Sequence, residues 1–387
     1  MNQGAMKCLA PGAVLGMLGA GQLGRMFAVA ARQAGYRVAV FGGGPDSPCG
    51  QVSDFCFDKS FADSAALEEF AAVVDVVSYE YENIPLDAVK FLEQRVPVYP
   101  DSNLLQTAQH RLLEKRAMRS IGIPTADFVA VNSAEDLQAG LSEFGGEGIL
   151  KTATLGYDGK GQQRLDSSCD VQQVYASFNG VELILESIVP FELELSIVAC
   201  GFADGTRKFF TPSVNHHVNH ILDCSVAPAA QLSTEVVQRA EQIAAAILDH
   251  FQVIGVLCVE FFMTADQQLL VNEIAPRPHN SGHLTIESTA ASQFEQQFRA
   301  VSGLPSGNVR PLRPAVMLNL LGDHLEHATA DAWREVFGLE DVHVHMYGKQ
   351  EARRGRKMGH LTVLDDVLEN AEKRARQARR ILGWTGE

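Results

Sequence analysis

"VLCVEFFMTADQQLLVNEIAPRPHNSGH", residues 256–283, contains two apolar runs separated by the short polar segment TADQQ. Apolar runs of this length on either side of a five-residue loop are typical of a β-hairpin. If Thr264 and Leu269 close the loop, antiparallel pairing places Glu260 directly opposite Glu273. Directly opposed side chains have Cβ atoms about 5 Å apart, so the hairpin predicts two carboxylates in close proximity.

Two buried carboxylates at this separation repel each other unless a cation lies between them. Oxygen ligands favour Mg²⁺ or Mn²⁺ over zinc, and a Mg²⁺ held by few carboxylates usually takes phosphates as further ligands. The hairpin therefore indicates a nucleoside triphosphate site; a protonated glutamic acid or a shifted register is the alternative. The loop after the second strand is rich in donors suited to anionic oxygens, namely Arg277, His279, Asn280, Ser281 and His283.

The middle of the chain adds a second signal for a triphosphate. In GEGILKTATLGYDGKGQQRL, residues 146–165, Lys151 ends an apolar strand just before a loop with glycines at 156, 159 and 161 and a lysine at 160. Glycines allow close backbone approach, and the lysines supply charge for phosphate oxygens. The spacing is not that of a Walker loop, and an ordinary hairpin tip is the alternative. In residues 181–199, Glu186 and Glu194 occur within apolar strands, which is costly without a partner and indicates a ligand.

The segment GMLGAGQLGRM, residues 16–26, has the G-x-G-x-x-G spacing of a dinucleotide-binding turn. An apolar strand precedes it, a helix ending at Gly35 follows, and RVAVFG gives the next strand, so a βαβ unit is expected. Free N–H groups at such a helix start attract an anion. A dehydrogenase would carry an acidic residue at the end of the second strand, where this chain has FGGGPD, so a nicotinamide cofactor is disfavoured. Simple helix-to-strand packing is the alternative.

Residues 73–85, VVDVVSYEYENIP, form the next expected strand, with Glu80, Glu82 and Asn83 at its carboxyl end. Open α/β sheets bind ligands at this edge, so these side chains are candidates for the amine or hydroxyl groups of a small molecule. A solvated loop start is the alternative. Near the other end of the chain, Lys349, Arg353, Arg356 and Lys357 form a basic cluster that suits a phosphate, or else a surface loop or dimer contact.

Composition limits the class of protein. The 387 residues suit two or three domains, and 46% hydrophobic residues with 20% charged ones are ordinary for a globular protein. A net charge of −15 argues against nucleic-acid or membrane-surface partners. The seven cysteines are scattered without C-x-x-C spacing, which fits a reducing cytoplasm. Neither a secretory signal nor a membrane-length apolar run is recognised, so a cytoplasmic protein is expected.

These motifs together resemble the ATP-grasp superfamily and, within it, the 5-(carboxyamino)imidazole ribonucleotide synthase family. The resemblance covers nearly the whole chain and rests on GAGQLGRM, YEYENIP, GYDGKGQ, LES, VEFF, NEIAPRPHNSGH and RRGRKMGH. It implies an α/β and α+β protein with an ATP-grasp fold. The expected parts are an N-terminal Rossmann-like, biotin-carboxylase-like domain (1–105), an ATP-grasp domain (106–305) with a mobile lid at about 124–186, and a small β-rich C-terminal domain with a terminal helix (306–387).

The resemblance also implies an activity. Family members use ATP, Mg²⁺ and bicarbonate to carboxylate 5-aminoimidazole ribonucleotide through carboxyphosphate, releasing ADP and phosphate in purine biosynthesis. Another ATP-grasp ligase, such as a formate-dependent glycinamide ribonucleotide transformylase, is the alternative enzyme. A nucleotide-binding module without catalysis is disfavoured by the opposed glutamates, since such a module has no need of a metal and a closing lid. A homodimer is what the family implies.

Residue roles follow from the same resemblance. The expected ATP-binding residues are Arg111, Lys151, Gly156, Gly159, Gly161, Gln162, Glu186, Ile188, Val189, Glu194, His217, Asn272 and Glu273. Glu260 and Glu273 would hold Mg²⁺, with Mn²⁺ as the substitute. The expected catalytic residues are Tyr157, Asp158, Lys160, Arg277, His279, Asn280 and Ser281. The expected residues for the ribonucleotide are Gly21, Gln22, Leu23, Glu80, Asn83, Lys349 and Arg356.

The chain departs from the family pattern at a few positions. Val214 and His220 stand where the family commonly has an acid and a glycine, His110 where an aspartate often precedes the arginine, and Arg354 where a proline is common. These departures concern loop conformation more than the reaction.

Overall fold

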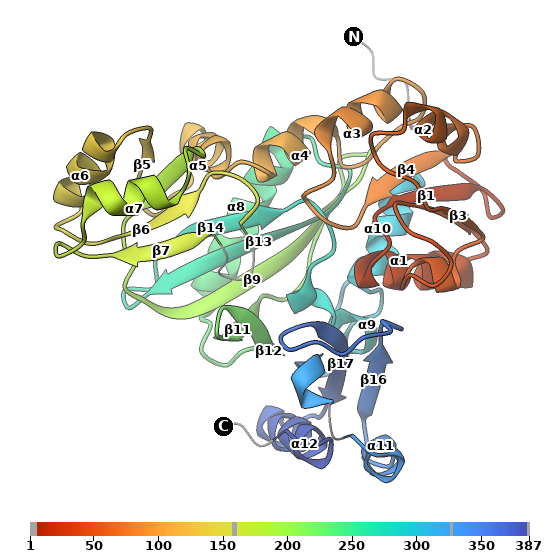
Figure 1. The fold of residues 1–387 in the computed structure, drawn as a ribbon. Coiled ribbons are helices and arrows are strands. Elements are labelled where there is room, and N and C mark those ends of the chain that lie inside the picture. The colour runs from red at the N-terminus through yellow and green to blue at the C-terminus, as the bar shows by residue number, and fades with distance from the viewer. Residues whose placement is uncertain (1–5, 157–160, 326–327, 385–387) are drawn as a thin grey trace.

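The computed structural model describes residues 6–156, 161–325 and 328–384, which form three sheets with helices packed on them. The N-terminal sheet and a small sheet lie at opposite ends of the molecule, the large sheet extends between them, and its C-terminal strands lie at the bottom of the view (Figure 1). No helix within the described ranges is long and apolar enough to cross a membrane.

The N-terminal sheet is parallel, with strand order β3-β2-β1-β4. Its elements are β1 (Val14–Leu18), α1 (Gln22–Gln33), β2 (Arg37–Phe41), β3 (Phe55–Phe57), α2 (Ser64–Ala71), β4 (Val76–Tyr79), α3 (Leu86–Glu93) and α4 (Ser102–Ala108). The βαβ unit predicted from the glycine-rich turn is confirmed, and Gly35 adopts a left-handed φ of 83° after α1. The chain runs from β1 outward to β2 and β3 and then returns to β4 on the other side of β1, so the carboxyl ends of β1 and β4 form the crevice at which open sheets bind ligands.

The small sheet is antiparallel, with strand order β5-β8-β6-β7. It consists of β5 (Phe128–Val131), β6 (Gly148–Thr152), β7 (Gln162–Leu165) and β8 (Leu183–Glu186), with α6 (Ala134–Glu143) and α7 (Val171–Ser177) packed on one face. Lys151 lies near the end of β6, and Glu186 ends β8. Leu150 and Leu185 pack toward the helices, so Lys151 and Glu186, which alternate with them along the strands, lie on the opposite face of the sheet, where they form an ion pair.

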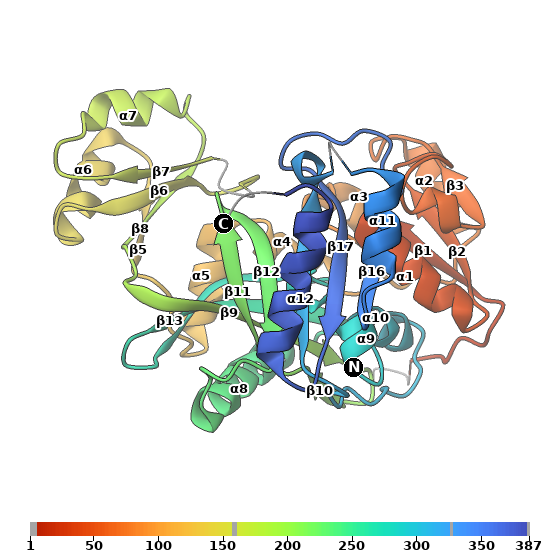
Figure 2. The same ribbon diagram turned by 90° about the horizontal axis from the view of Figure 1, so that it is seen from below.

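The large sheet has nine strands, and its main path runs β14-β13-β9-β11-β12-β15-β17-β16. The strands are β9 (Phe191–Gly201), β10 (Arg207–Phe209), β11 (Ser213–Val218), β12 (Ile221–Ala227), β13 (Gly255–Thr264), β14 (Leu269–Ala275), β15 (Ala315–Leu321), β16 (Val342–Met346) and β17 (Lys357–Leu364). Pairing of β12 with β15 makes the C-terminal strands a continuation of this sheet. Helices α11 (Ala330–Phe337) and α12 (Leu368–Ile381) cover the C-terminal strands (Figure 2).

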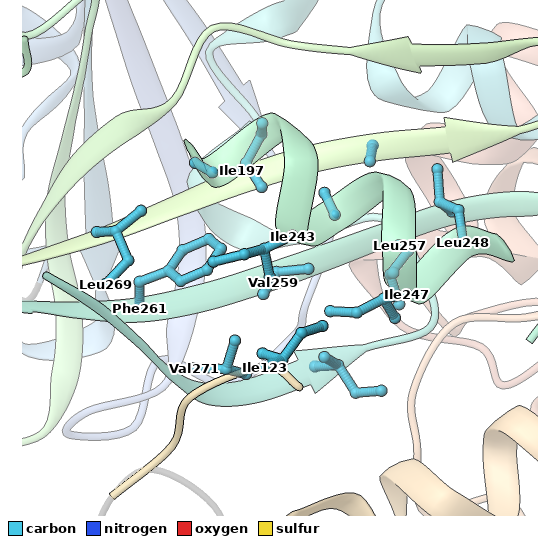
Figure 3. Close-up of a cluster of buried hydrophobic side chains, with 14 of the residues drawn as sticks. Ile123, Ile197, Ile243, Ile247, Leu248, Leu257, Val259, Phe261, Leu269 and Val271 are labelled. Atoms are coloured by element: carbon cyan, nitrogen blue, oxygen red, sulfur yellow. The ribbon is translucent and has the colours of Figure 1, made fainter. Parts of the chain in front are cut away.

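The main core lies between the large sheet and helix α8 (Thr234–His250) (Figure 3). Ile243 and Ile247 are one helical turn apart, so both face Leu257, Val259 and Phe261 on β13. On β13 the alternate residues point away from α8, and these include Glu260 and Phe262. The core therefore fixes the strand that carries the predicted metal ligand.

The turn between β11 and β12 explains one departure from the family pattern. Asn219 and His220 both have left-handed φ values, 50° and 65°. Two consecutive positive φ angles in a two-residue hairpin are typical of a type I′ turn, in which glycine at the second position is unstrained. His220 therefore occupies the conformation that a glycine would adopt, and its side chain reaches the cavity described below.

Truncating the core at Ile247 should destabilise the protein strongly. Ile247 is fully buried, so Ile247→Ala leaves a cavity and should cost about 2–5 kcal/mol of unfolding free energy, measured by urea denaturation. Val181 is 47% exposed, so Val181→Ala should change stability by less than about 0.5 kcal/mol. Equal losses in the two variants would contradict the assignment of the core to α8 and β13.

Candidate functional site

A cavity of about 980 Å³ lies where the N-terminal sheet, the small sheet and the large sheet meet. It brings together many of the residues predicted from the sequence: Gln22, Leu23, Glu80, Asn83, Arg111, Lys151, Gly156, Gln162, Glu194, His217, Glu260, Asn272, Glu273, Arg277, His279 and Asn280. Residues that are far apart in the chain thus form one polar site.

Other predicted residues do not line the cavity. These are Gly21, Gly161, Glu186, Ile188, Val189, Ser281, Lys349 and Arg356. Glu186 and Ser281 lie just behind its wall, because each bonds to a lining residue, Lys151 and His279 respectively. Tyr157, Asp158, Gly159 and Lys160 lie outside the described residues.

The hairpin of β13 and β14 places Glu260 opposite Glu273, as the sequence predicts, but by a different register. The loop is one residue tighter than expected: Met263 pairs with Leu269, and the Thr264 N–H donates to the Gln268 carbonyl. The predicted closure at Thr264 and Leu269 is therefore wrong. A β-bulge between Glu260 and Phe261 then restores the pairing, because Asn272 is an extra residue on β14.

The bulge also determines what faces the cavity. Regular alternation would send Asn272 and Glu273 to opposite faces of the sheet. Across the bulge both line the cavity. The carbonyl of Asn272 accepts a hydrogen bond from Lys115 Nζ at 2.9 Å, which holds the bulge against α5 (Arg111–Ser120).

The two opposed carboxylates have different electrostatic environments. Burial opposes ionisation of Glu260, but His279 Nε2, 2.8 Å from its Oε1, lowers the pKa of Glu260 to about 2. Glu273 is shifted the other way: burial and the charge of Glu260 raise its pKa, although Arg111 partly compensates. The pair is therefore short of positive charge, which is the condition that a bound cation would relieve.

Two arginines line the cavity, and each is held by partners in the protein. Arg111 Nη2 donates to the Gly156 carbonyl at 3.1 Å, and its Nη1 lies 3.8 Å from Glu273 Oε2. Arg277 pairs with Glu82, and its Nη1 donates to the Pro278 carbonyl at 3.1 Å. The Nε–H of both arginines is buried and has no hydrogen-bond partner among the described residues. The guanidinium groups of both residues give this part of the cavity positive charge suited to an anion.

Behind the cavity lies a buried ion cluster that the sequence analysis missed. Glu186 Oε2 is 2.7 Å from Lys151 Nζ, and its Oε1 is 3.8 Å from Lys115 Nζ. Burial opposes its ionisation, but the two lysines lower the pKa of Glu186 to about 2. Burial likewise lowers the pKa of Lys115 and raises that of Glu114 to about 8. The helical spacing of Arg111, Glu114, Lys115 and Met118 was the available signal, since it places these residues on one face.

The Glu194 carboxylate, on β9, has a histidine partner. Its Oε2 lies 2.7 Å from His217 Nδ1 on the neighbouring strand β11. Burial alone would lower the pKa of His217, but the bond to Glu194 raises it. The ion pair forms part of the cavity wall on the large sheet.

The glycine-rich turn already binds an anion, which is a side chain of the protein. The N–H groups of Gly21 and Gly24 donate to the two carboxylate oxygens of Glu80 at the start of α1. A Cβ at Gly19 or Gly21 would lie 2.6 Å from Glu80 Cγ or 2.7 Å from Glu80 Oε1. The glycines thus allow Glu80 to approach, and a phosphate at these N–H groups would require Glu80 to move.

The C-terminal basic cluster is largely engaged in its own loop. Lys349 Nζ donates to the Lys357 carbonyl at 2.6 Å, and Arg356 Nη1 donates to the Glu351 carbonyl at 3.0 Å. Burial and the neighbouring Arg356 lower the pKa of Lys349 to about 8. Of the four basic residues in this cluster, Lys357 lines the cavity.

Sequence reasoning also missed an apolar part of the wall. Ile149, Phe191 and Phe262 line the cavity, and the rings of Phe191 and Phe262 stack with centroids 4.6 Å apart. Single apolar residues in amphipathic strands carry no signal that separates a binding wall from a core. Their contribution follows only from the tertiary arrangement, in which Ile149 of the small sheet lines the same cavity as Phe191 of β9 and Phe262 of β13.

Removing Lys115 should destabilise the protein in a pH-dependent way. Lys115→Met leaves Glu186 short of a cationic partner, at a cost of about 3–5 kcal/mol at pH 7. Because the folded pKa of Glu186, about 2, is below its ordinary value of 4.5, its ionised form stabilises the fold above pH 4.5. That stabilisation disappears as the pH falls toward 2, so the difference between wild type and variant should narrow over this range.

Urea denaturation at a series of pH values measures this difference. Arg116 is the exposed neighbour of Lys115 on the same helix, so Arg116→Met should lower stability by less than about 0.5 kcal/mol at every pH. A loss in Lys115→Met that stayed constant from pH 7 to pH 2 would show that Glu186 is not its electrostatic partner.

Comparison with known proteins identifies three domains. Residues 13–109 match the ribonucleotide synthetase preATP-grasp domain, residues 116–294 match the ATP-grasp domain, and residues 315–374 match the phosphoribosylaminoimidazole carboxylase C-terminal domain. In sequence, the chain is 41% identical over 354 residues to the N5-carboxyaminoimidazole ribonucleotide synthase of Bacillus subtilis (strain 168), with 92% of each chain covered.

Solved structures agree with the sequence comparison. An ADP complex of an N5-carboxyaminoimidazole ribonucleotide synthetase superposes with a TM-score of 0.91 at 41% identity, covering 97% of this chain and 98% of that one. N5-carboxyaminoimidazole synthase from Aspergillus clavatus, in complex with ADP and 5-aminoimidazole ribonucleotide, gives a TM-score of 0.85 at 28% identity, covering 96% and 99%.

Proposed function

The chain belongs to the N5-carboxyaminoimidazole ribonucleotide synthase family of ATP-grasp ligases, and on that premise we propose that it carboxylates 5-aminoimidazole ribonucleotide with ATP and bicarbonate. The products are N5-carboxyaminoimidazole ribonucleotide, ADP and phosphate. The observation that carries the proposal is the cavity that the opposed carboxylates Glu260 and Glu273 line together with the guanidinium groups of Arg111 and Arg277.

ATP occupies the part of the cavity between the small sheet and the large sheet. Ile149 and Phe262 provide an apolar surface for the base, and Glu194 with His217 provides acceptors and donors for the ribose hydroxyls. Lys151 and Arg111 are placed to meet the phosphates. Glu186 does not touch this space; it holds Lys151 in position through their 2.7 Å ion pair.

The carboxylates that line the cavity are suited to bind a divalent cation. Glu260 and Glu273 are opposed carboxylates, and burial together with the charge of Glu260 raises the pKa of Glu273. Among the described residues no set of three or more His, Cys, Asp and Glu side chains is arranged to hold a metal alone. Two carboxylate ligands with phosphates completing the shell are typical of Mg²⁺. Bound there, the ion would neutralise charge on the ATP phosphates.

The chemistry needs no side-chain nucleophile. A bicarbonate oxygen attacks the γ-phosphorus of ATP, the bond from that phosphorus to the bridging oxygen breaks, and ADP leaves with carboxyphosphate as the other product. Arg111 and Lys151 offset charge on the transferring phosphoryl oxygens. The 5-amino nitrogen then attacks the carboxyl carbon, the bond from that carbon to the bridging oxygen breaks, and the leaving phosphate takes up the proton that the amine releases.

The loop after β14 serves the second half of the reaction. Arg277, His279 and Asn280 line the cavity and offer donors to the anionic oxygens of carboxyphosphate, and Ser281 supports His279 from behind. Tyr157, Asp158 and Lys160, which lie outside the described residues, are proposed to cover this intermediate, with Asp158 orienting the amine. Excluding water is essential because carboxyphosphate hydrolyses readily.

The ribonucleotide lies against the N-terminal sheet. Glu80, Asn83, Gln22 and Leu23 line the cavity at the carboxyl ends of β1 and β4. Because Glu80 already fills the anion position of the glycine-rich turn, its carboxylate is suited to hydroxyl or amine groups of the substrate. The substrate phosphate is then expected on the side of Lys357, with Lys349 and Arg356 behind it. The homodimer that the family resemblance implies stays a prediction.

Release of ADP from Mg-ATP should depend on both bicarbonate and 5-aminoimidazole ribonucleotide. Glu273→Gln removes one of the two opposed carboxylates, so it should lower kcat about 100-fold or more and raise the Mg²⁺ concentration needed for half-maximal rate. Glu192 is an exposed carboxylate on β9 that does not line the cavity, so Glu192→Gln should retain wild-type rates.

A coupled assay for ADP measures these rates. Stimulation by glycinamide ribonucleotide with formate, in place of the imidazole substrate with bicarbonate, would refute the proposed substrate and leave the ATP-grasp chemistry in place. Full activity of Glu273→Gln would refute the role of the opposed carboxylates.

A further inference from the structure

Helix α10 (Gln293–Val301) carries three glutamines that are completely buried, Gln293, Gln296 and Gln297. A primary amide is costly to bury unless its groups are hydrogen-bonded. Gln297 connects β4 with β13: its Oε1 accepts from the Val256 N–H, and its Nε2 donates to Ser78 Oγ. Gln296 accepts from the Gly307 N–H. Gln293 is different, because its partners belong to the loop that lines the cavity.

The Gln293 amide holds both backbone groups of His279. Its Oε1 accepts from the His279 N–H at 2.8 Å, and its Nε2 donates to the His279 carbonyl at 2.7 Å. The backbone fixes the orientation of the amide, because an N–H must face the oxygen and a carbonyl must face the nitrogen. The same Nε2 lies 3.2 Å from His283 Nδ1 at the end of the loop.

Two further contacts show that the loop is shaped around this amide. A Cβ at Gly282 would lie 2.5 Å from Gln293 Oε1, so only glycine leaves room for it. Thr285 Oγ1 accepts a hydrogen bond from the backbone N–H of Gln293 at 3.1 Å and donates one to the Gly282 carbonyl at 2.6 Å. Residues 279–285 thus surround the first turn of α10.

The loop held in this way supplies the groups that face the reaction. His279 Nε2 reaches Glu260, His279 Nδ1 lies 2.9 Å from Ser281 Oγ, and Asn280 Nδ2 donates to Asn319 Oδ1 at 3.1 Å. The nine residues between β14 and α9 (Thr285–Ser288) have no regular secondary structure beyond one short 3₁₀ turn. Its position depends on contacts from outside.

We propose that Gln293 is a positioning residue for the carboxylation, which acts by clamping both sides of His279 so that His279 and Asn280 face carboxyphosphate. The inference rests on the proposed function for its chemical meaning. Gln293 itself does not line the cavity and touches no reacting group. A misplacement of about 1 Å in a reacting geometry can cost about 100-fold in rate, so a clamp on the backbone has catalytic consequences.

Two substitutions test the clamp. Gln293→Met keeps the shape and removes both hydrogen bonds, whereas Gln293→Glu keeps an acceptor for the His279 N–H and places a carboxylate oxygen against the His279 carbonyl. Both should lower kcat at saturating substrates by about 10- to 100-fold, with KM for ATP changed less than about threefold, because the ATP-binding wall is formed by other elements.

Gln297→Met is the matched control. It removes an equally buried amide with two hydrogen bonds from the same helix, but its partners are outside the loop. It should lose stability to a similar extent and keep kcat within about twofold of wild type. If kcat falls as much in Gln297→Met as in Gln293→Met, the fall reflects general damage to α10, and the clamp is refuted.

Crystal structures of the Gln293 variants decide the question independently of turnover. The clamp predicts that the His279 imidazole separates from Glu260 while α10 stays in place. An unmoved loop would refute the clamp whatever the kinetics show. If 5-aminoimidazole ribonucleotide does not stimulate ADP release by the wild-type enzyme, the proposed substrate is refuted. The clamp is then still tested, because the loop geometry of the variants can be compared with that of the wild type. Gln293→Glu serves if Gln293→Met does not fold.

Discussion

The site depends on one irregularity, the extra residue Asn272 in the pairing of β13 with β14. Without it, the tight loop at Thr264 would place Glu260 out of register with Glu273, and Asn272 and Glu273 would face opposite sides of the sheet. With it, two carboxylates oppose each other in the cavity, and Lys115 holds the bulged carbonyl. The core between α8 and β13 keeps this hairpin rigid, so the charges cannot separate to relieve their repulsion.

Acidic side chains around the cavity are balanced by local partners. Glu260 is paired with His279, Glu194 with His217, Glu82 with Arg277, and Glu80 with the start of α1. Each of these four acids thus has a partner, although the protein as a whole carries a net charge of −15. What remains is the repulsion between Glu260 and Glu273, beside the cationic groups of Arg111, Lys151 and Arg277 that also line the cavity. This arrangement suits a metal-bound triphosphate and an anionic intermediate.

Whether a feature of this structure can be predicted from the sequence depends on how far apart in the chain the interacting residues are. The βαβ unit and the opposed glutamates follow from local periodicity, and both are confirmed. The loop closure at Thr264 and Leu269 was wrong because a bulge leaves no mark in an apolar pattern. Glu80 binds N–H groups of the glycine-rich turn that lie 56 or more residues before it in the chain, and Lys115 pairs with Glu186, 71 residues later. Rules based on residue spacing do not detect interactions at this range. Charged residues on the buried face of α5 were the one local clue.

The central claim is that bicarbonate attacks the γ-phosphate in the cavity between the three sheets. Bicarbonate labelled with ¹⁸O tests it most directly, because the attacking oxygen stays on phosphorus when the amine displaces phosphate from carboxyphosphate. The account predicts one ¹⁸O atom in each phosphate released in the presence of 5-aminoimidazole ribonucleotide, observed by ³¹P NMR or mass spectrometry. Phosphate that carries no label from bicarbonate, and takes its new oxygen from water instead, would contradict it.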